Sequence, residues 1–222
     1  LRMVTTVCTK EVTDHQVVQE SIPRRLWRSL STPDEMAVAG RELGERNFFT
    51  EMVRITDVVQ VPAVGDSVAD QYSEGCFSTW DVSLGALVAT VTGSARPVDK
   101  SNITEDDLAV LVGVRPDGSG ALVRHVEGKR NSPPSTEALE MVDMDRSLPK
   151  ISLGSGWGVR ASVPVARSKL HGHRGIAGIH PGNVEFAPLE PQYYHYLVSC
   201  GTGAQAVAIR EAFARAEALQ NP

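Results

Sequence analysis

The chain has 222 residues, of which 41% are hydrophobic and 22% charged, and it carries a formal net charge of −5. A chain of this length can bury a sizeable core in one domain, and its composition excludes wholesale disorder. The acidic balance excludes an electrostatic nucleic-acid binder, and no apolar run approaches the roughly eighteen residues that cross a bilayer. We therefore expect a globular protein with neither a nucleic-acid nor a membrane partner.

Residues 1–32 are polar and charged, and we expect them to form an N-terminal arm. They lack the apolar stretch of a signal peptide, and three widely spaced cysteines do not fit a secreted disulfide scaffold, so the expected location is cytoplasmic. The start Leu1-Arg2-Met3 places the native beginning either at Met3 or upstream. Leu26 and Trp27 need a surface to dock on, which favours a homo-oligomer joined through the arm.

Residues 33–222 are expected to form a single globular α+β domain. A helix should begin at Thr32-Pro33-Asp34-Glu35 and run to about Asn47, because Thr32 can cap it and the two acids favour its positive end. Strands are expected at 53–61, in hairpins at 76–80 with 86–92 and 108–114 with 121–126, and later at 159–166, 184–187 and 193–199. A short helix at 135–144 and a final helix at about 203–219 complete a largely antiparallel sheet with helices near its two ends.

The densest group of chemically capable side chains lies at residues 169–182. His171, His173 and His180 fall within ten positions, among four glycines that permit unusual backbone conformations. A His-x-His pair in a strand points both imidazoles to one side, and a third histidine can complete a site for Zn²⁺, Fe²⁺ or Mn²⁺. The alternative is a polar glycine- and histidine-rich surface loop without a ligand.

Cations surround these histidines, and a second candidate site follows at the start of the last helix. Arg160, Arg167 and Arg174 would favour an anionic ligand, although a solvated strand edge carries the same charges. Gly201, Thr202 and Gly203 could hold a phosphate or carboxylate at the helix N-terminus. Cys200 there could act as a nucleophile with His195 as its base. The alternative is that Thr202 is only a helix cap and Cys200 a buried residue.

Several short segments resemble the first half of class II aldolase domains. They are residues 93–100, 103–110 and 117–118 and Pro134-Ser135-Thr136-Glu137, and the helix at 39–46 fits that family's opening helix. The resemblance covers roughly a third of the chain. In that family a metal-binding His-x-His closely follows Pro-Ser-x-Glu, whereas here residues 138–170 separate His171 from Glu137, and no glycine-asparagine substrate loop stands at the expected place. We therefore transfer no residue roles from it.

Three functions remain open at this point. The first is a small-molecule enzyme of hydrolase or lyase type that acts on an anionic carboxylate or phosphate substrate, with a divalent metal held by the three histidines. The second is a metal-free enzyme that uses Cys200 and His195. The third is a non-catalytic binding or structural subunit. The clustering of glycine, histidine and arginine favours the first.

Overall fold

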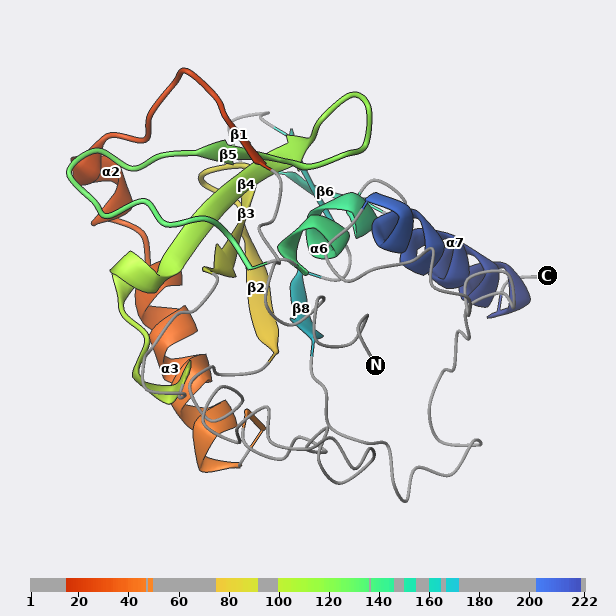
Figure 1. Cartoon of the computed structure of the whole chain (residues 1–222), viewed down its shortest axis with the longest axis horizontal. Coiled ribbons are helices and arrows are strands. Elements are labelled where there is room, and N and C mark those ends of the chain that lie inside the picture. Colours follow the sequence, from red (N-terminus) through yellow and green to blue (C-terminus); the bar gives the residue numbers. More distant parts are fainter. Residues whose placement is uncertain are drawn as a thin grey trace, which may run out of the picture.

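A six-stranded, mostly antiparallel sheet with helices on both faces organises the fold (Figure 1). The computed structural model describes residues 15–46, 48–49, 75–91, 100–135, 137–145, 150–154, 160–164, 167–171 and 203–220. The strands of the sheet lie in the order β1-β5-β4-β3-β2-β8, with β1 parallel to β5 and every other pair antiparallel. Their bounds are β1 His15–Val17, β2 Cys76–Asp81, β3 Ala86–Thr90, β4 Leu108–Val114, β5 Ala121–Arg124 and β8 Ser168–His171.

The remaining elements are four helices, two 3-10 turns and a separate two-stranded sheet, counted over the described residues. The helices are α2 Arg24–Trp27, α3 Thr32–Glu45, α6 Ala138–Met144 and α7 Gly203–Gln220, and the 3-10 turns are η1 Lys100–Asn102 and η2 Glu105–Asp107. The small sheet pairs β6 Lys150–Gly154 with β7 Arg160–Pro164. This architecture confirms the expected α+β fold.

The central strands are buried on both sides because helices cover both faces of the sheet. In β3, Leu87 and Ala89 face α6 and α7, whereas the alternate residues Ala86 and Val88 face α2 and α3. Figure 1 shows α2 and α3 on one side of these strands and α6, with α7 beside it, on the other. We call the two packed layers the α6-side core and the α3-side core.

The two expected hairpins are confirmed. β2 and β3 flank a turn in which Asp81 Oδ1 accepts a hydrogen bond from the Leu84 N–H at 2.8 Å. β4 and β5 flank a turn in which Gly118 has a φ of +74°, a value that glycine adopts without strain. Asp117 accepts hydrogen bonds from the N–H and the hydroxyl of Ser119, which lowers the pKa of this exposed carboxyl.

The helix expected from residue 32 is also confirmed, but Thr32 does not cap it. Helix α3 buries Met36 against the α3-side core, and Ala39 and Leu43 pack beside it at helical spacing. The hydroxyl of Thr32 donates to Asp81 Oδ2 at 2.5 Å, so it ties the helix to the sheet instead of to its own first turn. A tertiary hydrogen bond therefore replaces the local one that the sequence suggested.

The second half of the expected arm, from residue 15 onward, packs against the same sheet. β1 pairs with β5, Ile22 and Trp27 are fully buried in the α3-side core, and Leu26 is exposed. Trp27 Nε1 donates to Glu105 Oε2 at 2.9 Å, and Arg24 forms an ion pair with the other oxygen of Glu105. Residues 1–14 lie outside the described residues.

Other features of the structure differ from the sequence predictions, and some predicted strands lie outside the described residues. The polar, proline-containing stretch at 128–134 is typical of an exposed loop, yet Lys129 within it is buried. Its Nζ donates to the carbonyl oxygens of Leu108 and Arg130 and lies 5.9 Å from the ring centroid of Trp27. Strands β1, β6 and β8 were not expected. The expected strands at 53–61, 184–187 and 193–199 lie outside the described residues. No helix in the described part of the chain has the length and apolar character needed to span a membrane.

Candidate functional site

A buried group of polar side chains gathers at the beginning of β2, around the thiol of Cys76. Cys76 is the first residue of the strand and has no exposed surface. It follows Gly75, whose φ of +73° lets the chain turn into the strand. The side chain of Cys76 points into the α6-side core, where its sulfur lies 4.0 Å from the sulfur of Met141.

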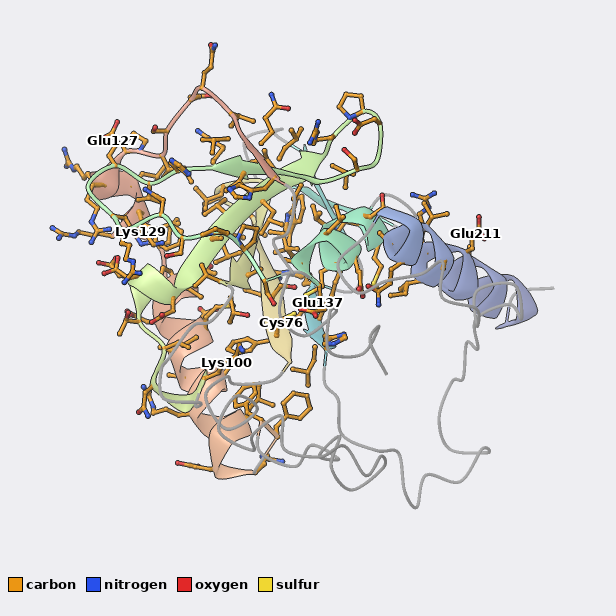
Figure 2. The ribbon with its side chains drawn as sticks, in the orientation of Figure 1. Cys76, Lys100, Glu127, Lys129, Glu137 and Glu211 are labelled. Atoms are coloured by element: carbon orange, nitrogen blue, oxygen red, sulfur yellow. The ribbon has the colours of Figure 1, made fainter. Side chains whose placement is uncertain are left out.

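Helix α6 and the loop before it bring two carboxylates to this thiol. Glu137 and Glu140 are 7% and 5% exposed. The hydroxyl of Ser135 donates to Glu137 Oε2 at 2.8 Å, and the N–H of Ser135 donates to the carbonyl of Thr90 at 2.9 Å. Strand β3 therefore holds Ser135, and Ser135 orients Glu137. Figure 2 shows Glu137 and Cys76 beside each other at the start of α6.

Lys100 approaches the same place from the opposite side of the sheet. It is 2% exposed, and its Nζ lies 5.9 Å from the ring centroid of Phe49 in the α3-side core. Its backbone carbonyl faces Gly40 of α3 so closely that a Cβ on Gly40 would come within 3.0 Å of the oxygen. The absence of a side chain at Gly40 thus lets α3 pack against η1 and fixes the position of Lys100.

These neighbours determine the charge state of the thiol. Burial raises the pKa of Cys76 well above its ordinary value of 9.0, and the negative charge of Glu137 raises it further. A hydrogen bond with Ser135 and the positive charge of Lys100 oppose this rise, and Glu140 adds to it. Cys76 is therefore a neutral thiol at physiological pH and not a nucleophile.

His171 is the sequence-predicted site residue that the structure brings to this group. It ends β8 and stands directly opposite Cys76 in the antiparallel register, so both side chains start from the same face of the sheet. We call Cys76, Lys100, Ser135, Glu137, Glu140 and His171 the Cys76 cluster. Within the residues that can be described, no three His, Cys, Asp or Glu side chains are placed to hold a metal ion.

The structure describes the backbone position of three other sequence-predicted residues, Arg160, Arg167 and Gly203. Arg167 is exposed, and its carbonyl accepts a hydrogen bond from the Trp80 N–H at 2.8 Å. Arg160 begins β7, and its side chain is not described. Gly203 begins α7 and lies against the turn at Gly118. Seven residues lie outside the described part of the chain: His173, Arg174, His180, His195, Cys200, Gly201 and Thr202.

The sequence interpretation missed most of the cluster, although one signal was present. Glu137, Glu140 and Asp143 recur at every third residue, which places them along one side of a short helix whose other positions are apolar. In the structure all three are buried, and Asp143 forms an ion pair with Arg210 of α7 at 2.6 Å. The sequence contained no signal for Cys76 or Lys100, because their proximity depends on packing between elements.

A pocket lies between α3 and the edge of the sheet formed by β2 and β8. It has a volume of about 510 Å³, and its lining includes Met36, Phe77, Ser78, Lys169 and Leu170. Because side chains alternate along a strand, Phe77 and Leu170 point to the α3 side of the sheet, whereas the thiol of Cys76 points to the α6 side. The pocket therefore lies across the sheet from the thiol.

Comparison of the chain with protein-family models, curated proteins and solved structures finds no match in any of the three.

Proposed function

We propose that the protein is a small-molecule enzyme of lyase type that acts on an anionic substrate at the Cys76 cluster, with Glu137 as the group that moves a proton. The observation that carries the proposal is the burial of Lys100, Glu137 and Glu140 around one strand end. Burying charged groups costs free energy, and such clusters are concentrated at functional sites.

Glu137 suits the role of acid and base because Ser135 restricts its orientation. The hydroxyl of Ser135 donates to Glu137 Oε2 at 2.8 Å, and a carboxylate that is held in one orientation can take a proton from a carbon next to a carbonyl group. The negative charge that develops on the substrate then requires a positive partner, and the charge of Lys100, which reaches Cys76 from the opposite side of the sheet, supplies one.

The state of Cys76 favours a lyase over a thiol-dependent hydrolase. Hydrolysis by covalent catalysis needs a thiolate, whereas burial and Glu137 raise the pKa of this thiol and keep it protonated. Proton transfer by a carboxylate does not require a thiolate. The neutral thiol then lines the site as a small, weakly polar group.

The test is proton exchange on small anionic carbonyl compounds in D₂O, followed by NMR. The full chain should catalyse exchange at the carbon next to the carbonyl in at least one member of a set of 2-oxo acids and phosphorylated ketones. Glu137→Gln should reduce the rate by about 100-fold or more, because general acid–base catalysis contributes at least that much. Glu211→Gln, an exposed position on α7, should leave the rate unchanged.

Two results would contradict the proposal. The first is the absence of exchange with every compound of the set. The second is exchange by Glu137→Gln at the rate of the unaltered chain, provided that both proteins show the same thermal unfolding midpoint.

A metal-assisted form of the same reaction is the second candidate, and the position of His171 favours it. His171 faces the α6 side opposite Cys76, and a divalent ion held by His171, His173 and His180 would polarise a substrate carbonyl there. Elemental analysis of the purified protein should then find about one equivalent of a transition metal, and His171→Asn should lose it. Full activity in a metal-free preparation would eliminate this form.

A further inference from the structure

A second pocket lies where α2, the start of α3 and η2 meet. Figure 1 shows α2 and α3 on the same side of the sheet, and none of the described residues that line this pocket belongs to the Cys76 cluster. Its volume is about 330 Å³, near the lower end of the roughly 300–1,000 Å³ that ligand pockets in proteins occupy. The pocket therefore has room for a small molecule.

Apolar side chains form much of the lining. Trp27 and Pro33 are buried, and Leu30 and Ala37 are half-buried. The N–H of Leu30 donates to the carbonyl of Trp27 at 3.2 Å, which fixes the turn between α2 and α3. Ala37 follows Pro33 by four residues and lies on the same face of α3. These walls favour a ligand with an apolar group, because apolar surface is more stable out of water.

Two polar side chains of the lining already bond within the protein. Glu105 accepts a hydrogen bond from Trp27 Nε1 at 2.9 Å with one carboxylate oxygen and pairs with Arg24 through the other. The hydroxyl of Thr104 donates to Asp107 Oδ2 at 3.0 Å. Glu105 and Thr104 are therefore satisfied without a ligand.

Arg28 and Asp34 line the same pocket and carry opposite charges, but they do not pair with each other. Both side chains are exposed, and within the described part of the chain neither has a hydrogen-bonding or ionic partner. Arg24 adds a further free donor nearby, because its Nη2 pairs with Glu105 while its Nη1 is buried without an acceptor. The α2 side of the pocket thus lacks an anion, and the α3 side lacks a cation.

We propose that this pocket binds a free α-amino acid with an apolar side chain. The ligand's carboxylate would pair with the guanidinium of Arg28, and its ammonium group would pair with the carboxylate of Asp34. Its side chain would lie against the apolar walls beside Trp27. A ligand with only one charge leaves the other protein group unpaired, so the pocket should select zwitterions. This site is separate from the reaction proposed for the Cys76 cluster.

The experiment is isothermal titration calorimetry of the full chain with L-valine, L-leucine and L-phenylalanine, which differ in the size of the apolar group. At least one of them should bind with a Kd below about 1 mM. The N-acetyl derivative of the tightest binder lacks the ammonium charge, and its amide lacks the carboxylate charge. Each derivative should bind at least about tenfold more weakly than the amino acid, because each loses one charged hydrogen bond.

Substitutions assign each ligand charge to one side chain. Arg28→Gln should bind the amino acid and its amide with equal affinity, because the partner of the carboxylate is gone. Asp34→Asn should bind the amino acid and its N-acetyl derivative with equal affinity for the corresponding reason. Arg25→Gln and Glu35→Gln are the matched controls, since they remove exposed charges next to this lining and should keep both differences.

Four results would overturn the inference. None of the three amino acids binds, or the N-acetyl and amide derivatives bind as tightly as the amino acid. Arg28→Gln and Asp34→Asn keep the differences of the unaltered chain, which would place the ligand elsewhere. Binding is lost in Glu137→Gln, which would place the ligand at the Cys76 cluster. The comparison of ligands in the unaltered chain needs no substitution, so it holds even if a variant fails to fold.

Discussion

The thiol of Cys76 illustrates how single residues in this protein take their properties from neighbours that are distant in sequence. Burial and the charge of Glu137 raise the pKa of Cys76, and Lys100 reduces the rise. These three residues come from a strand, a loop and a 3-10 turn. Their chemistry is therefore a property of the folded chain and changes when any one of them is substituted.

Alkylation measures this effect directly. At about pH 7.5, Cys76 in the native chain should react with iodoacetamide at least about tenfold more slowly than in urea. Burial restricts access to the thiol and raises its pKa, so that little reactive thiolate is present. Glu137→Gln removes a negative neighbour and should increase the native rate, whereas Glu211→Gln should not. Equal rates in native and unfolded protein would show that the thiol is neither buried nor protonated as described.

The raised pKa of Cys76 also predicts how the stability of the protein depends on pH. Because the folded chain holds the thiol proton more tightly than the unfolded chain, Cys76 favours folding only while both forms are protonated. Its contribution to the free energy of unfolding should decline as the pH rises above 9.0, the ordinary pKa of the group. Cys76→Ala should flatten the decline in urea midpoint over that range, and an unchanged slope would contradict the assignment.

At the scale of elements, the contact between α7 and the β4–β5 turn depends on the absence of a side chain at Gly203. A Cβ on Gly203 would come within 3.0 Å of the carbonyl oxygen of Gly118, a backbone atom that cannot move aside. The backbone of the turn thus approaches the first residue of α7. Arg210, farther along α7, pairs with Asp143 and fastens the helix to α6.

Gly203→Ala should therefore weaken the docking of α7. We expect a loss of about 1–3 kcal/mol, as for overpacked contacts in general, measured as a lower urea midpoint in circular dichroism. Gly113→Ala is the matched control, because its Cβ would meet only Leu122 Cδ1 at 3.9 Å. If both variants unfold at the same urea concentration, α7 does not rest on this turn.

The elements that local patterns define could be predicted, and those that tertiary contacts define could not. Helix α3 and the two hairpins have strong local signals, namely helical spacing of apolar residues and turn residues such as Asp117-Gly118. β1 and β8 have only three and four residues, with polar side chains that give no alternating pattern. Of the candidate site, sequence reasoning identified His171 alone, because the charged partners of Cys76 meet only through packing.

At the scale of the whole molecule, a polar network attaches α2 to η2 and to the loop after β5. Glu105 of η2 accepts a hydrogen bond from Trp27 Nε1 and pairs with Arg24, while Lys129 lies over the Trp27 ring. Three segments that are well separated in sequence thus meet at one indole. Their joint contribution is modest in energy, because the Arg24–Glu105 pair is partly exposed.

Glu105→Gln tests the network with a change of a single charge. Gln can still accept the indole hydrogen bond, but Arg24 loses its ion pair, so we expect a loss of about 1 kcal/mol and a shift in tryptophan fluorescence. Glu127→Gln, at an exposed position nearby (Figure 2), should change neither. Equal stability of the two variants would show that the pair contributes nothing.

The order of the strands also has a consequence for how the folding chain assembles the Cys76 cluster. β2 to β5 form a meander whose neighbours are close in sequence, whereas β8 must return from residue 168 to pair with β2. Contacts between distant residues form late in folding because loop closure costs entropy. The meander carries Cys76, and the late strand carries His171. A nascent chain that ends before β8 would hold a completed hairpin core and a Cys76 cluster that lacks His171, so synthesis must proceed past His171 before the cluster is complete.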